Sequence, residues 1–107
     1  MIKEEFCNLI KEWSHDTCCL SYHDTSHPAY VKALQAGEEV IPWALERLKD
    51  SIGHDVGGAM DHDNSPWFTI CLLSDLTNRE CVAKFPRKHA GMLDKIRKHI
   101  IKWGESK

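Results

Sequence analysis

Residues 28–52, PAYVKALQAGEEVIPWALERLKDSI, decide the fold, because they carry the start and stop signals of two successive helices. Pro28 suits the first turn of a helix, where its missing N–H costs nothing, and Gly37 suits a left-handed C-cap. Glu38 then lies near the positive end of a second helix dipole, and Pro42 still falls in or near the first turn. The apolar residues that step along one face of this second helix are Ile41, Leu45, Leu48 and Ile52. We therefore predict two antiparallel helices joined by a tight glycine turn.

Two amphipathic helices flank this pair in the sequence. The first has a single apolar stripe made of Ile2, Phe6, Leu9, Ile10 and Trp13. The last is expected from Lys88 to Trp103, with Gly104 closing it. Its inner stripe contains Leu93, Ile96, Ile100 and Trp103. The charged residues expected to point outward from it are Lys95, Arg97, Lys98 and Lys102.

A fifth helix is predicted over residues 65–76, where Ser65-Pro66 is a helix-start signal. The apolar run that follows would also suit a buried strand, but the start signal favours a helix. Residues 77–87 are expected to be irregular or to form a short strand. Helices this short are not stable alone, so they must share one core. The fold class predicted is all-α, with about five short helices in one compact domain over residues 1–107.

The middle of the chain resembles a family of short bacterial helical proteins. The residues that carry the resemblance are His27-Pro28-Ala29-Tyr30, Gly37, Ile41-Pro42, Leu45-Glu46-Arg47-Leu48, Trp67-Phe68, Leu76-Thr77 and Trp103-Gly104. They span roughly residues 26–104. Proteins of that family resemble HEAT-type helical hairpin repeats, so the resemblance implies a HEAT-like bundle that displays surfaces for partners. It brings no catalytic residue.

Length and composition are those of one globular domain, with 107 residues, 42% hydrophobic and 28% charged. The charged start at residues 3–5 is unlike a secretory signal, and no apolar run reaches the ~18 residues of a membrane helix. We expect a cytoplasmic protein with no membrane partner. The five cysteines cannot all pair with one another, so reduced thiols are expected.

Charge is divided unevenly along the chain. Residues 1–78 contain five Lys/Arg against thirteen Asp/Glu, whereas residues 79–107 contain nine against three. Such a division marks either a nucleic-acid-binding surface on the basic part or two surfaces that pair within one domain. The favoured expectation is internal pairing, because the formal net charge is −2.

The seven histidines are the main signal for chemistry, since four of them directly precede an aspartate. Each of these pairs lies where caps and turns are expected, so a structural role is the default. The richest segment is the long loop 53–64, in which His54, His62 and Asp63 are candidate ligands for a divalent metal. A second, weaker zinc site would use Cys18 with His15 and His23.

A binding protein is favoured over an enzyme, because no catalytic constellation is visible. The main hypothesis is a non-catalytic adaptor or inhibitor that docks on a larger protein through an acidic surface. Trp43, expected off the inner face of its helix, is the candidate anchor, and Asp55, Asp61 and Asp63 are candidate contacts. One alternative is a metal-dependent hydrolase or metal-binding domain that uses the loop from His54 to Asp63. Another alternative is nucleic-acid binding through the basic C-terminal helix.

Overall fold

The computed structural model describes residues 1–17, 24–52, 64–89 and 92–106, and every regular element among them is helical. The five α-helices are α1 (Lys3–Thr17), α2 (Pro28–Ala36), α3 (Ile41–Asp50), α4 (Pro66–Leu76) and α5 (Leu93–Glu105). Three short 3₁₀ helices accompany them: η1 (Gly37–Val40), η2 (Glu80–Val82) and η3 (Arg87–His89). The predicted all-α class is confirmed, and residues 65–76 form the expected helix rather than a strand.

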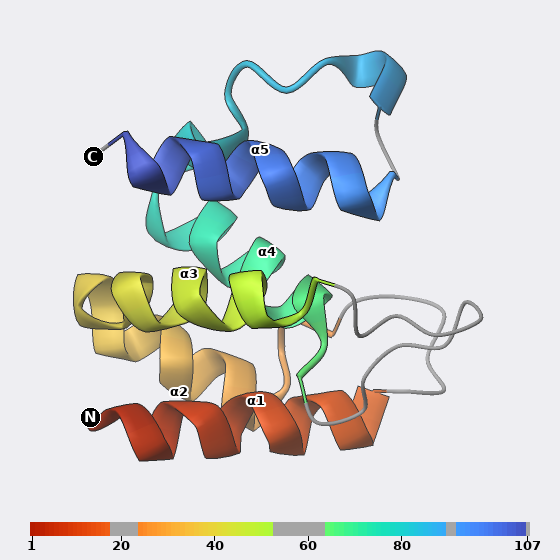
Figure 1. Cartoon of the computed structure of the whole chain (residues 1–107). Helices are drawn as coiled ribbons and strands as arrows, with labels where there is room; N and C mark the ends of the chain where they lie inside the picture. The colour runs from red at the N-terminus through yellow and green to blue at the C-terminus, as the bar shows by residue number, and fades with distance from the viewer. Residues whose placement is uncertain (18–23, 53–63, 90–91, 107) are drawn as a thin grey trace.

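Helix α4 lies at the centre of the molecule and contacts all four other α-helices. Its sequence is apolar almost all round, and six of its eleven residues are buried, which is the pattern of a helix surrounded by protein. Figure 1 shows α1 and α5 at opposite ends of the molecule, with α3 between them. Helix α2 packs against α1, and α3 packs against both α4 and α5.

The aromatic core gathers around Phe68 of α4. The ring of Phe68 meets those of Trp13, Tyr30 and Phe6 edge to face, at centroid distances of 5.5, 5.6 and 6.3 Å. These four side chains are at most 2% exposed. Edge-to-face pairs contribute about 0.5–1.5 kcal/mol each beyond the burial of their area. The cluster therefore joins α1, α2 and α4 into one unit.

The start and stop signals of α2 are confirmed. His27 is its N-cap, and its ring accepts a hydrogen bond from the Ala29 N–H. Gly37 ends the helix with φ of 77°, a left-handed conformation that strains other residues. The predicted antiparallel packing of α2 on α3 is wrong, however. η1 separates the two helices, and each packs mainly on other elements.

Helix α1 extends one turn beyond the last residue of its apolar stripe, Trp13, and ends at Thr17. The hydroxyl groups of Ser14 and Thr17 donate to the carbonyl oxygens of Ile10 and Trp13, at 2.6 and 2.7 Å. These bonds satisfy hydroxyl groups that are buried in the structure. Ser14 and Thr17 therefore satisfy their buried hydroxyl groups within the last turn of the helix.

Helix α5 departs most from its prediction. It begins at Leu93 instead of Lys88, and Gly104 lies inside it instead of closing it. Arg97, expected on the outer face, is 1% exposed. Its guanidinium donates to the Ser51 carbonyl and hydroxyl oxygens, at 3.2 and 3.1 Å, and to Asp94 at 2.5 Å. These acceptors replace the hydrogen bonds to water that the Arg97 guanidinium loses, and so they offset the cost of burying its charge.

Gly104 has a packing role instead of a capping role. A Cβ at this position would lie 2.7 Å from a methyl carbon of Leu45 in α3. The missing side chain therefore lets the end of α5 approach α3 closely. No described helix is both long enough and apolar enough to cross a membrane.

Candidate functional site

Most residues of the predicted metal and partner site fall outside the described part of the chain. This applies to His54, His62, Asp55, Asp61 and Asp63, and also to Cys18, Cys19 and His23. Their proposed roles remain predictions. Within residues 1–17, 24–52, 64–89 and 92–106, no group of three or more His, Cys, Asp or Glu side chains is placed to hold a metal ion.

Trp43, the predicted partner anchor, is only partly exposed. Its ring packs against Phe6 of α1, with centroids 6.1 Å apart, and it borders the aromatic core. Some of the side chain therefore serves to hold α3 on α1. Its role as an anchor remains a prediction.

One described His–Asp contact exists, and it is not between sequence neighbours. His27 Nε2 lies 2.8 Å from Asp16 Oδ2, while Nδ1 accepts the Ala29 N–H. A ring nitrogen that accepts carries no proton, so the neutral ring carries it on Nε2 and donates to Asp16. Nε2 joins α2 to α1, and Nδ1 caps α2 itself. This histidine has a structural role.

The described cysteines are free thiols: Cys7 and Cys71 are half-buried and Cys81 is buried. Burial, with a smaller contribution from the charge of Asp75, raises the pKa of the Cys71 thiol to about 11. Burial also raises the pKa of Cys81. The thiolate is the nucleophilic form. At neutral pH Cys71 is therefore protonated and is not an activated nucleophile.

An open groove of about 570 Å³ lies between α4, the segment after it and α5. Its walls are mainly apolar, with Ile70, Val82 and Phe85 among them, and Asp75 and Arg79 supply its charge. Asp75 is already engaged, because the Tyr30 hydroxyl donates a short hydrogen bond to it. Burial raises the pKa of Tyr30, which keeps this donor protonated. The described lining contains no pair of groups arranged for acid–base catalysis.

The end of α4 beside this groove has an uncommon backbone. Asn78 and Arg79 both have positive φ, at 53° and 67°. The Arg79 N–H donates to the Ser74 carbonyl at 2.7 Å and the Asn78 N–H to the Asp75 carbonyl at 3.4 Å, the pattern of a Schellman cap. The two left-handed residues turn the chain away from α4 and carry it along the groove toward α5.

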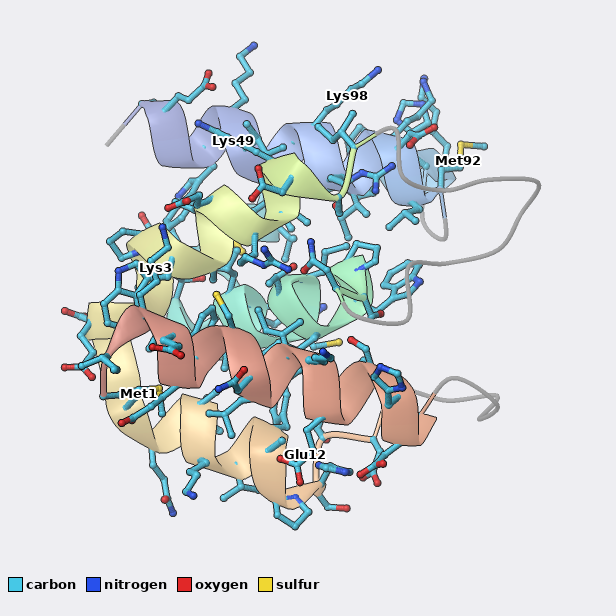
Figure 2. All side chains as sticks on the ribbon, turned by 60° about the horizontal axis from the view of Figure 1, so that its bottom comes forward. Met1, Lys3, Glu12, Lys49, Met92 and Lys98 are labelled. Atoms are coloured by element: carbon cyan, nitrogen blue, oxygen red, sulfur yellow. The ribbon has the colours of Figure 1, made fainter. Side chains whose placement is uncertain are left out.

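Carboxylates gather at one end of the molecule, which we call the acidic end. It consists of the exposed residues Glu4, Glu5, Glu12, Asp16, Glu38 and Glu39, on α1 and η1. Asp16 contacts His27, and Glu39 contacts the N-terminal amine at 3.0 Å. The other four form no ion pair with a described residue. Figure 2 shows Glu12 of this end and Lys98 of α5 on opposite sides of the molecule.

Cations gather at the other end, which we call the basic end. Its exposed lysines are Lys84, Lys88, Lys95, Lys98 and Lys102. Between described residues, no ion pair joins a carboxylate of residues 1–78 to a cation of residues 79–107. The ion pair that links the two parts has its cation in residues 1–78 and its carboxylate in residues 79–107: Lys49 lies 3.5 Å from Glu105. The expected internal pairing is therefore not found in the described part of the chain.

A second groove, of about 470 Å³, opens at the basic end between η2 and the C-terminal half of α5. Glu80 and Lys84 lie on one wall, and His99, Lys102 and Trp103 lie on the other. Beside it, Phe85 contacts the rings of His99 and His89, at 5.3 and 6.1 Å. Sequence reasoning assigned Trp103 to the core and did not single out His99. The spacing of these residues could have predicted the groove wall, because positions 99, 102, 103 and 106 share one helix face.

No family model, curated protein or solved structure matches the chain.

Proposed function

We propose that the chain is a non-catalytic binding module that docks on a protein partner through its acidic end. The observation that supports this most is a group of exposed carboxylates on the side of the molecule opposite the lysines of the basic end. Glu4, Glu5, Glu12 and Glu38 form no ion pair with a described residue. A basic surface on the partner would complement them and speed the encounter. The role would be that of an adaptor, or of an inhibitor that covers a basic surface.

The spacing on α1 supports one contact surface. Glu5 and Glu12 are seven residues apart, two helical turns, so both face the same side. Nucleic acid and anionic membranes would be repelled by this surface, which leaves a basic protein as the fitting partner.

The test is capture followed by reconstitution with purified components. The wild-type chain is used to capture partners from a native lysate, and the captured protein is then purified and its association rate measured at several salt concentrations. The test variant is Glu5→Lys with Glu12→Lys. The matched control is Asp50→Lys with Glu105→Lys, which makes the same charge change near α3 and the end of α5, where the ion pairs are exposed and weak.

We expect the test variant to slow association at least tenfold at low salt, and the control to change it less than threefold. Equal effects of the two variants would show that net charge alone matters and would refute docking through the acidic end. A partner whose association is insensitive to salt would refute it as well.

The alternative metal-binding role of His54, His62 and Asp63 rests on the sequence. Native mass spectrometry of protein purified without chelator reports bound zinc or manganese directly. A stoichiometric metal that is lost in His62→Ala would replace the binding-module proposal, whereas a metal-free mass would leave it standing.

A further inference from the structure

The groove at the basic end has two properties that the rest of the described surface does not combine. It has cations on both of its walls, with Lys84 from the segment after η2 and Lys102 from α5. The wall formed by α5 also carries the aromatic rings of His99 and Trp103. The groove beside α4 has one charge of each sign, Asp75 and Arg79. The groove at the basic end has two lysines against the single carboxylate of Glu80, so its lining keeps a net positive charge.

The lysines at this groove keep their charge available for a ligand. Lys84 and Lys102 are exposed, and neither forms an ion pair with a described residue. The buried Arg97 does not contribute, because Ser51 and Asp94 hold its guanidinium on the other side of α5. Positions 95, 98, 99 and 102 lie within two turns of the helix, so Lys95 and Lys98 extend the same cationic surface.

We propose that this groove binds single-stranded nucleic acid, with phosphates on Lys84 and Lys102 and a base against His99 and Trp103. Proteins that hold single strands combine a cationic track with aromatic side chains on which bases stack. The groove volume of about 470 Å³ lies within the range of pockets that hold small ligands, roughly 300–1,000 Å³. A duplex keeps its bases stacked inside and would use only the lysines.

This inference is independent of the acidic end. A chain with both surfaces would bridge a basic protein and a nucleic acid strand, which is the arrangement of an adaptor. Failure of one proposal leaves the other intact, because the residues lie at opposite ends of the molecule (Figure 2).

The experiment is fluorescence anisotropy of a labelled 12-nucleotide oligo(dT), titrated with the full chain at several salt concentrations between 50 and 200 mM. The test variant is Lys84→Gln with Lys102→Gln. The matched control is Lys11→Gln with Lys32→Gln, which removes two exposed lysines of α1 and α2 that form no ion pair with a described residue. A third variant, Lys84→Arg with Lys102→Arg, keeps the charge, and circular dichroism confirms that all variants fold.

We expect the Gln variant at the groove to weaken binding at least tenfold at 50 mM salt, with the control within twofold and the Arg variant close to wild type. The slope of log K against log salt should fall by about 1.4, since each phosphate contact on a single strand contributes about 0.7. His99→Ala should weaken binding without changing that slope, which separates the stacking contact from the charge.

Three competitors decide what the surface recognises: a duplex of the same length, a polyglutamate peptide and vesicles containing phosphatidylserine. We expect the unlabelled strand to displace the probe at least tenfold better than any of them. Equal competition by the peptide or the vesicles would overturn the proposal in favour of a general anion or a lipid surface. Equal competition by the duplex, or no binding of the strand at 50 mM salt, would also overturn it.

Discussion

The two ends of the molecule are attached to the central helices in different ways. At the α1–α2 end, the ring of Phe68 in α4 is enclosed by the rings of Phe6, Trp13 and Tyr30, and the Tyr30 hydroxyl adds a hydrogen bond to Asp75. At the α5 end, a buried guanidinium holds the helix to Ser51 at the end of α3, and Ile100 is its one fully buried apolar side chain. Apolar contacts tolerate small shifts, whereas the hydrogen bonds of Arg97 need their acceptors in place.

This difference indicates that stability is concentrated at the aromatic end. Local unfolding is easier where few apolar side chains are buried. Among its apolar side chains, helix α5 buries only Ile100, whereas α1 buries Phe6, Leu9, Ile10 and Trp13, so α5 should open more easily than α1. The surface that we assign to nucleic acid lies on the less firmly held helix, while the acidic surface lies on the more firmly held one. Changes to the two attachments should therefore have unequal consequences.

The largest effect is expected for Phe68→Ala. Removing this ring leaves a cavity between three other rings and should lower the free energy of unfolding by about 3–5 kcal/mol. Chemical denaturation followed by circular dichroism measures it. A loss below 1 kcal/mol would show that the aromatic end is not the main source of stability.

A smaller and more local effect is expected for Arg97→Met. The apolar replacement fills similar space but leaves the Ser51 carbonyl and hydroxyl oxygens without their donor, at a cost of about 1–3 kcal/mol. Amide hydrogen exchange should speed up in α5 and stay slow in α4. The neighbouring exposed Lys98→Met is the control, and equal exchange in both variants would contradict the role of Arg97.

Tyr30→Phe should cost about 1 kcal/mol, because it removes only the hydroxyl that donates to Asp75 and keeps the ring in the core. A double-mutant cycle with Asp75→Asn isolates the interaction. Additive losses would show that the two groups do not stabilise each other.

The smallest effect concerns Asp24, whose pKa is lowered by hydrogen bonds from the Ser26 hydroxyl, at 2.7 Å, and from the Ser26 backbone N–H, at 3.0 Å. A lowered pKa contributes stability above the ordinary value of 3.8 that is lost as the pH falls through the folded value. Ser26→Ala should move the Asp24 pKa toward 3.8. It should therefore reduce the stability that the lowered pKa contributes and that is lost at acid pH. A carboxyl ¹³C NMR titration measures it, and an unchanged pKa would mean that the hydroxyl has no influence.

Local signals in the sequence predicted α2 and α4 well, because Pro28, Pro66 and Gly37 act through their own backbone. Gly104 did not act in this way, because it lies inside α5. The burial of Arg97 was not predictable from such local signals. An amphipathic pattern places a charge outward, and the acceptor that overrides it, Ser51, lies 46 residues away in the chain. The same holds for Asp16 and His27, which meet through tertiary packing. The candidate metal loop from His54 to Asp63 remains a sequence prediction.

The close approach at Gly104 has a consequence for how the chain can vary. Alanine there would require the Leu45 methyl groups to move, and any larger side chain would act as a wedge between the last turn of α5 and α3. Lys102 and Trp103 belong to that same turn, so a wedge would also displace one wall of the basic groove. Position 104 should thus accept alanine through a shift of the Leu45 methyl groups but not a larger side chain. A functional defect caused by a larger side chain would arise from altered spacing between helices, with every charged group retained.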